Sequence, residues 1–244
     1  MDRPYIICHM VASLDGKVTG DFLGKSAYSG LIADYYRIHR EYGADGFLCG
    51  RVTLEGSFPQ PPVSPAVYDG PPIEREDYIA ESAAFYAVAI DPQGKLWWSD
   101  RVIADTDAGY DGAHIIEVLT KSVPDAFLAY LRDKGVSYLF GGKTELNLAL
   151  VAQKLKRLFN METLLLEGGG IVNGSFLQAG LIDEISLVVV PEAECSEKAI
   201  SLFQTGQYQN SDTSAAAFRM KDAKKLDNGG LWLIYQKQSS VLLK

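Results

Sequence analysis

The sequence predicts an α/β protein with a mostly parallel central sheet, helices on both faces and an antiparallel C-terminal hairpin. Strand-like and helix-like runs alternate along most of the chain, which is the pattern of repeated β-α-β units. Glycine-rich turns follow two of the apolar runs, at residues 141–142 and 168–170. Near the end, two strand-like runs flank Asn228-Gly229-Gly230, a hairpin signal.

The individual elements follow from the spacing of apolar residues. Short apolar runs predict strands, whereas apolar residues at helical spacing, as at Leu31, Tyr35 and Ile38, predict helices. Pro124 suits the first turn of a helix, and residues 91–94 form a turn that closes a strand. The predicted strands are 5–13, 46–50, 86–90, 102–104, 115–119, 137–140, 163–166, 185–190, 218–227 and 231–238, and the predicted helices are 31–41, 124–134 and 146–159.

The composition is that of an ordinary globular protein, and we expect a single domain over residues 1–244. The proline-rich stretch 59–65 is predicted to be a surface loop, because similar strand-helix units continue on both sides. A formal net charge of −8 argues against a nucleic-acid partner, which needs a basic face. No apolar run is long enough to span a bilayer, and the N-terminus lacks a signal peptide's apolar region. We therefore expect a cytoplasmic protein without a membrane partner.

The three cysteines, Cys8, Cys49 and Cys195, are widely spaced and odd in number. Two of them lie within apolar runs, so we expect buried free thiols in a reducing compartment. The sequence has no CxxC or HxxxH pair, so no metal site is predicted.

A carboxylate and three glycines between a strand and a helix form the most informative motif. The apolar run ends at Leu166, and Glu167 and the glycines 168–170 follow directly. Glycine lets the backbone adopt positive φ and approach a ligand closely. The free N–H groups of a helix N-terminus attract anions. The motif therefore favours a phosphate-binding turn at the carboxyl edge of the sheet, with a ligand-free turn as the alternative, because the GxGxxG and P-loop spacings are absent.

Three segments together carry a resemblance to a known family. They are residues 13–17 (Ser-Leu-Asp-Gly-Lys), residues 50–56 (Gly-Arg-Val-Thr-Leu-Glu-Gly) and residues 167–184, from the glycine motif through Asn173 to Ala-Gly-Leu-Ile-Asp-Glu. The chain resembles the riboflavin-biosynthesis reductase family, the C-terminal reductase domain of the bifunctional deaminase-reductase, which has a dihydrofolate-reductase-like fold. The PCxxC signature of a zinc deaminase is missing, so we expect a stand-alone reductase.

The resemblance implies an NADPH-dependent oxidoreductase and assigns residues to it. Asp15, Lys17 and Glu167 would face the substrate as the catalytic set, with the ammonium on anionic oxygens and the carboxylates on hydroxyls. The cofactor-binding residues would be Ala12, Gly50, Arg51, Thr53, Gly168, Gly169, Gly170 and Ile171. The glycines 168–170 would approach the pyrophosphate, and the guanidinium of Arg51 could pair with a phosphate.

Some features of the expected enzyme stay open. The 2′-phosphate of NADPH needs a cation or hydroxyl cluster, and the candidates are Arg51, Lys95, Arg101, Thr120 and Lys121. The resemblance also implies a homodimer, with Trp97 and Trp98 either at the interface or in the core. His9 is the best histidine candidate for a catalytic role, whereas His39, on a helix with two arginines, is expected to be solvated.

The expected reaction is hydride transfer to the ribosyl carbon of 5-amino-6-(5-phosphoribosylamino)uracil or a close relative. One departure leaves the substrate open, because residues 54–59 replace the Asp-Asp-Pro-like loop usual in riboflavin-pathway members. A related reductase for a pterin or another heterocycle is therefore an alternative. A nucleotide-binding module without turnover is another, although the polar set at 15, 17 and 167 argues against it.

Overall fold

The computed structural model describes residues 1–58, 68–205 and 216–238, so the proline-rich stretch 59–65 lies outside the described residues. The chain divides into two compact units. We call residues 1–4 and 44–164 the parallel unit, and residues 5–43 and 165–244 the hairpin unit. The expectation of one domain stays a prediction. None of the helices in the described ranges combines the length and the apolar character needed to cross a bilayer.

Four parallel strands build the parallel unit, in the order β5-β4-β3-β2. Three of them, β2, β3 and β4, are buried at every position, as is typical of parallel strands covered on both faces. The strands are β2 (Gly46–Gly50), β3 (Tyr86–Ile90), β4 (His114–Thr120) and β5 (Ser137–Gly142), and the helices are α2 (Arg51–Ser57), α3 (Asp125–Lys134) and α4 (Leu148–Phe159). The strand predicted at 102–104 is wrong, because Val102 makes only an isolated bridge to His114.

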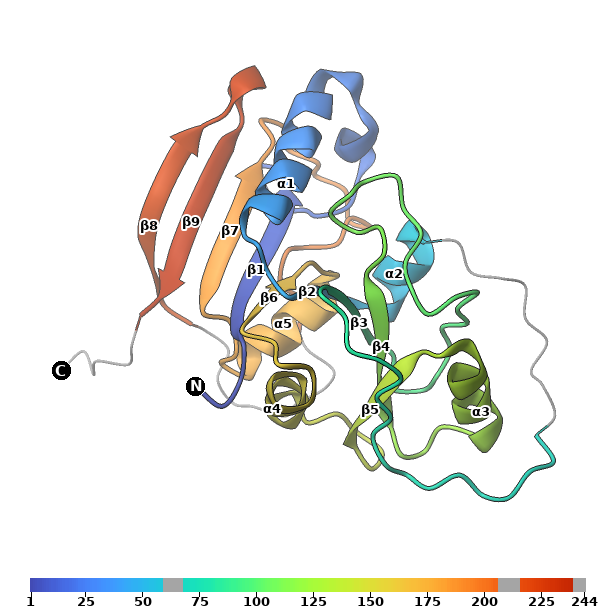
Figure 1. Ribbon diagram of the computed structural model, residues 1–244. Helices are drawn as coiled ribbons and strands as arrows, with labels where there is room; N and C mark the ends of the chain where they lie inside the picture. The colour runs from blue at the N-terminus through green and yellow to red at the C-terminus, as the bar shows by residue number, and fades with distance from the viewer. Residues whose placement is uncertain (59–67, 206–215, 239–244) are drawn as a thin grey trace. The chain divides into compact units, whose positions relative to one another are not determined.

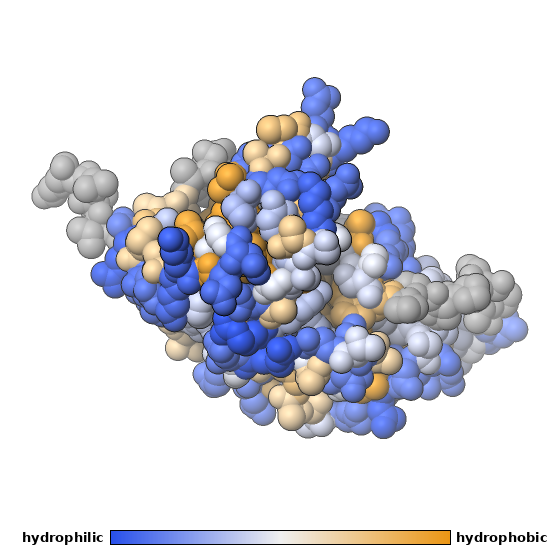
Figure 2. Space-filling view, turned by 90° about the horizontal axis from the view of Figure 1, so that it is seen from above, coloured by the Kyte–Doolittle hydropathy of each residue, from blue (hydrophilic) through white to orange (hydrophobic). Residues whose placement is uncertain are grey.

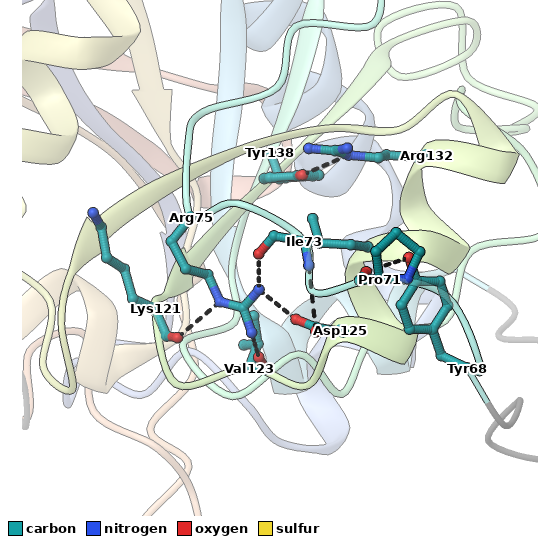
Figure 3. A network of polar contacts seen from close by, with 9 residues as sticks. All are labelled: Tyr68, Pro71, Ile73, Arg75, Lys121, Val123, Asp125, Arg132 and Tyr138. Atoms are coloured by element: carbon teal, nitrogen blue, oxygen red, sulfur yellow. Dashed lines mark hydrogen bonds and ion pairs between the residues drawn. The ribbon is translucent and has the colours of Figure 1, made fainter.

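Arginine 75 ties an extended segment to the edge of the parallel unit (Figure 3). Its guanidinium donates to the carbonyl oxygens of Lys121 at 3.1 Å and Val123 at 2.9 Å, and it pairs with Asp125 at the start of α3. Farther along, Tyr78 and Tyr138 exchange backbone hydrogen bonds of 2.8 and 2.9 Å. The segment thereby covers part of the free edge of β5, which would otherwise offer unpaired backbone groups.

The hairpin unit combines parallel and antiparallel pairing, in the order β1-β7-β9-β8. Strand β7 runs parallel to β1 and antiparallel to β9, and β9 runs antiparallel to β8. The strands are β1 (Tyr5–Ala12), β7 (Glu184–Val189), β8 (Phe218–Lys225) and β9 (Leu231–Lys237), and the helices are α1 (Ser29–Glu41), α5 (Gly170–Gln178) and the short η1 (Asp21–Gly24), η2 (Ser26–Tyr28) and η3 (Asp227–Gly229). Strand β6 (Thr163–Leu166) is divided between the units after Leu164.

Helix α1 covers one face of the hairpin unit's strands (Figure 1). Its Leu31 and Ile38 pack with Val188, Trp232 and Ile234 in one buried cluster. The hairpin predicted around residues 228–230 is confirmed as β8 and β9, joined through η3. Parallel strands, flanking helices and this antiparallel hairpin confirm the predicted fold class. In the view of Figure 2, hydrophilic side chains dominate the surface and hydrophobic ones form small separate groups, in keeping with the acidic composition.

Candidate active site

The glycine motif lies in the hairpin unit, between the end of β6 and the start of α5. Gly168 has φ +110°, a conformation that side chains rarely adopt, and a Cβ there would approach the Met10 side chain to 3.2 Å. Gly169 is the N-cap of α5, and no side chain caps this helix. Glycine at 168 therefore lets the chain turn sharply into α5, and the N–H groups of a helix N-terminus are of the kind that bind anions.

Two glycines of α5 are needed by the chain itself. Gly170 O accepts a hydrogen bond of 3.0 Å from Gln204 N. A Cβ at Gly170 would collide with the Ser201 carbonyl oxygen, and one at Gly174 with that of Gln204. The segment 201–204 thus packs directly on α5, and this contact explains both glycines without a ligand. The assignment of Gly168, Gly169, Gly170 and Ile171 to a cofactor stays a prediction.

Lysine 17 reaches the same segment from the first strand's turn. Its backbone is fixed by Ser13, whose N–H donates to Lys17 O at 2.9 Å and whose hydroxyl accepts from Lys17 N at 3.0 Å. Its half-buried side chain donates from Nζ to Ser201 Oγ at 3.3 Å. Lys17 and Gly170 therefore both contact Ser201, and the Lys17 ammonium lies near the first turn of α5.

Aspartate 15 organises the turn around it. Its carboxylate accepts hydrogen bonds from Ser13 Oγ at 2.6 Å and from the backbone N–H groups of Glu194 and Cys195, both at 2.9 Å. The Ser13 hydroxyl and these two N–H groups hold the pKa of Asp15 well below its usual value. Asp15 is therefore an exposed anion that fastens residues 194–195 to the turn after β1.

Glutamate 167 points into the hairpin unit and contacts a histidine. Its Oε1 lies 2.7 Å from His39 Nδ1, and both side chains are 2% exposed. The burial of His39 contradicts the expectation of a solvated histidine. The sequence carried a signal for it, because His39 follows Leu31 and Tyr35 at intervals of four on the apolar face of α1. Glu167 is thus held by a partner that sequence reasoning missed.

The buried environment of Glu167 also affects two residues of β1. Burial, with the Glu167 charge second, raises the pKa of the Cys8 thiol. Burial lowers the pKa of His9, although the Glu167 charge opposes it. His9 is fixed by Ser186 Oγ at 3.1 Å and Tyr35 O at 3.0 Å, and its ring stacks on Tyr35. His9 is therefore a neutral packed residue near neutral pH, and its contacts give it no free nitrogen for acid-base work.

The other predicted cofactor residues lie in the parallel unit. Gly50 ends β2 and Arg51 begins α2, where its Nη1 lies 2.6 Å from both carboxylate oxygens of Glu55. Thr53 lies two residues farther along the same helix. Ala12, by contrast, is a fully buried residue at the end of β1 in the hairpin unit. The predicted site residues thus form two groups, one in each unit.

The candidate residues for binding a 2′-phosphate lie at different ends of the parallel strands. Arg51 follows the carboxyl end of β2, Lys95 lies in the turn after β3, and Thr120 with Lys121 ends β4. Arg101 lies at the opposite end, since its carbonyl accepts from Ile115 N near the start of β4. Open α/β sheets bind ligands at the carboxyl ends of their strands, so Arg101 is the weakest candidate. Within the described ranges, no group of three His, Cys, Asp or Glu side chains could hold a metal ion.

Comparisons with known proteins agree on one family. The model of the RibD C-terminal domain matches residues 4–231. The chain is 28% identical over 190 residues to the 2,5-diamino-6-ribosylamino-4(3H)-pyrimidinone 5′-phosphate reductase of Methanothermobacter thermautotrophicus, with 78% of each protein covered.

Solved structures show the same fold. A pyrimidine reductase-like protein from Corynebacterium diphtheriae matches with a TM-score of 0.69 and 16% identity, over 97% of this chain and 92% of that one. Acinetobacter baumannii RibD matches with a TM-score of 0.62 and 20% identity, over 98% of this chain. The match spans only 59% of the RibD chain.

Proposed function

The chain belongs to the RibD C-terminal domain family, and from this premise we propose that it uses NADPH to reduce a phosphorylated ribosylamino-pyrimidine. Membership makes it a reductase of riboflavin biosynthesis. The proposed reaction moves a hydride to the ribosyl carbon of the ring-opened substrate and adds a proton, which converts the ribosyl group to a ribityl group. The name of the Methanothermobacter relative, a 5′-phosphate reductase for a ribosylamino-pyrimidinone, supports this substrate class.

The main structural support for the proposal is that Lys17 and the first turn of α5 both contact Ser201. Lys17 Nζ is held at 3.3 Å from Ser201 Oγ, and a Cβ at Gly170 would touch the Ser201 carbonyl oxygen. A cation and an uncapped helix N-terminus are two groups that bind phosphate oxygens. Their proximity suits a site that receives an anionic cofactor and an anionic substrate together.

The residues present fit a nicotinamide dinucleotide. The N-terminus of α5 would hold the pyrophosphate through backbone N–H groups. Within the parallel unit, the Arg51 guanidinium is a candidate partner for a phosphate. When bound, the nicotinamide supplies the hydride, so the protein's part is to orient the two reactants. Lys17 would bind the substrate through its phosphate or a sugar oxygen.

A turnover assay with product analysis tests the proposal. Purified protein is mixed with NADPH and the ribosylamino-pyrimidine 5′-phosphate, and absorbance loss at the nicotinamide band is followed together with product mass. We expect a product two hydrogen atoms heavier than the substrate, and loss of its formation in Lys17→Ala with nucleotide binding retained. Turnover of a pterin but not of the pyrimidine would select the alternative reductase. Nucleotide binding without turnover of either would select a binding module.

We also propose a homodimer that uses the open face of the hairpin unit's strands. Opposite the face covered by α1, the cross-strand row Leu187, Leu233 and Ala223 is flanked by Met220, 57% exposed, and Leu231, 39% exposed. Contiguous apolar residues of this kind mark protein interfaces, and a two-fold axis lets one such patch cover its copy. Sedimentation at micromolar concentration checks this, and a monomer would contradict it.

A further inference from the structure

Arginine 51 is already paired with an acidic residue of its own helix. Its Nη1 lies 2.6 Å from both Oε1 and Oε2 of Glu55, one turn along α2. The two side chains are 33% and 35% exposed, so the pair is accessible to solvent and to a ligand. A phosphate that binds Arg51 through Nη1 and a second guanidinium nitrogen must displace the Glu55 carboxylate from Nη1.

A second acidic residue, Asp91, lies at the same edge as Arg51, and burial raises its pKa. Asp91 follows β3, which is paired with β2 so that Gly50 lies opposite Ile90. The charges of Arg51 and Glu55 both act on the Asp91 carboxyl group, in opposite directions. Asp91 is 1% exposed and its Oδ2 accepts from the N–H groups of Lys95 and Leu96, so it cannot turn away from this edge.

Two lysines contribute positive charge to the same edge of the parallel unit. Lys95 lies in the turn that Asp91 closes, and Lys121 follows β4, with its N–H bonded to Gly142 O at 3.0 Å. Both are exposed. Arg51 differs from the two lysines in its setting, because it is paired with an acidic side chain four residues along the same helix.

We propose that Glu55 is a specificity-determining residue that weakens the preference for a dinucleotide with a 2′-phosphate. This inference rests on the proposed function, since it assigns Arg51 to the 2′-phosphate of NADPH. Glu55 competes with that phosphate for the guanidinium and repels it. NADH lacks the phosphate, so Glu55 leaves its binding unchanged. The wild-type chain is therefore expected to discriminate only moderately between the two cofactors.

Dissociation constants for NADPH and NADH test the proposal with Glu55→Gln, which keeps the shape of the side chain and removes its charge. We expect NADPH to bind about two- to fivefold more tightly, as the loss of one partly exposed ion-pair competitor implies, and NADH to bind as before. Arg51→Gln should weaken NADPH binding about tenfold or more. In the Arg51→Gln background, Glu55→Gln should have a smaller effect, because only the repulsion of the phosphate remains.

Helix α1 offers a matched control. Arg37 Nη1 lies 2.6 Å from Glu41 Oε1, also four residues apart on an exposed helix face. Glu41→Gln should leave both dissociation constants unchanged. Adenosine 2′-monophosphate and adenosine 5′-monophosphate identify the phosphate, because only the former should gain affinity in Glu55→Gln.

Three outcomes overturn the inference. An unchanged ratio of NADPH to NADH affinity in Glu55→Gln means that Glu55 does not compete for the phosphate. Equal tightening of both nucleotides means that Arg51 contacts a phosphate common to them. If the wild-type protein binds neither nucleotide, the proposed function is wrong and the inference falls with it. This result differs from the other two because it is seen in the wild-type protein, before any variant is measured.

Discussion

The two units place an aspartate after a parallel strand in similar hydrogen bonds, yet with opposite effects on its pKa. Asp15 follows β1 and Asp91 follows β3, and each accepts from two backbone N–H groups. Asp15 is exposed, and its donors lower its pKa. Asp91 is 1% exposed, and burial raises its pKa although both N–H groups oppose this. At Asp15 the largest cause is a third donor, the Ser13 hydroxyl, whereas at Asp91 the largest cause is burial.

Two buried glutamates differ in their partners rather than in their burial. In the hairpin unit, Glu167 has the imidazole of His39 as a partner at 2.7 Å. In the parallel unit, fully buried Glu117 accepts from Trp98 Nε1 at 2.5 Å, and its Oε2 has no hydrogen-bond partner among the described residues. Burial, and then the charge of Asp91, raises the pKa of Glu117 well above its usual value. Burial therefore favours the protonated form of Glu117 in the parallel unit, whereas Glu167 of the hairpin unit has a histidine partner.

Removing the histidine partner should have the largest effect. His39→Leu keeps the volume and takes away the Nδ1 group that contacts Glu167. Glu167 then loses a 2.7 Å contact in a buried position, so the free energy of unfolding should fall by about 3–5 kcal/mol. Urea unfolding followed by circular dichroism measures this change.

Two further variants show whether the pair itself is responsible. Arg37→Leu, on the same helix, removes an exposed partner of Asp34 and Glu41 and should cost less than about 1 kcal/mol. Adding Glu167→Gln to His39→Leu should restore part of the lost stability, because the neutral amide is cheaper to leave unpaired. A loss in the double variant equal to the sum of the single losses would contradict this account.

The neutral glutamate of the parallel unit should make stability fall as pH rises. The native pKa of Glu117 lies above the unfolded value of 4.5, so the native state keeps its proton while the unfolded state loses one. Stability linked to this group is complete below that value and declines by about 1.4 kcal/mol per pH unit until the native pKa is passed. Glu117→Gln removes the ionisation and should unfold at higher denaturant concentration than wild type at pH 8.

The contrast with low pH makes this prediction specific to ionisation. At pH 4 the wild-type glutamate is protonated in both states, so the advantage of Glu117→Gln should vanish. The fluorescence of Trp98, whose indole donates to Glu117, serves as a local reporter. A stability difference that is the same at pH 4 and pH 8 would mean that packing, not the proton, separates the two proteins.

Much of the fold could be predicted because it depends on local patterns. Buried parallel strands such as β3 give continuous apolar runs, and the turn at 228–230 marks a hairpin. The prediction at 102–104 failed because three apolar residues fit a bridge as well as a strand. For the two tryptophans, the core alternative holds at Trp98, which is 4% exposed, and Trp97 packs on Phe127.

The partners of the site residues were less accessible to sequence reasoning. The motifs located Asp15, Lys17 and Glu167, but their contacts come from segments far away in the chain. Ser201 lies 184 residues from Lys17, and His39 lies 128 residues from Glu167. Separations this long in the sequence produce no periodic pattern from which a contact could be predicted. Local helical spacing could have revealed the buried face of His39 and the pair of Arg51 with Glu55, because those depend on intervals of four residues.

The exposed aspartate of the hairpin unit should give the smallest effect, with the opposite dependence on pH. The native pKa of Asp15 lies below its usual value of 3.8, so its stabilising contribution is present above that pH and is lost as the carboxylate is protonated in acid. Asp15→Asn should therefore lower the Tm slightly at pH 7, and the difference from wild type should shrink as the pH falls below 3.8. Asp21→Asn, which removes another exposed carboxylate of the same unit, is the control. Suppose instead that the Tm of Asp15→Asn exceeds that of wild type, and that the excess grows with pH as expected for Glu117→Gln. The donors around Asp15 then do not stabilise its anion, and the explanation given for the contrast between the two aspartates is wrong.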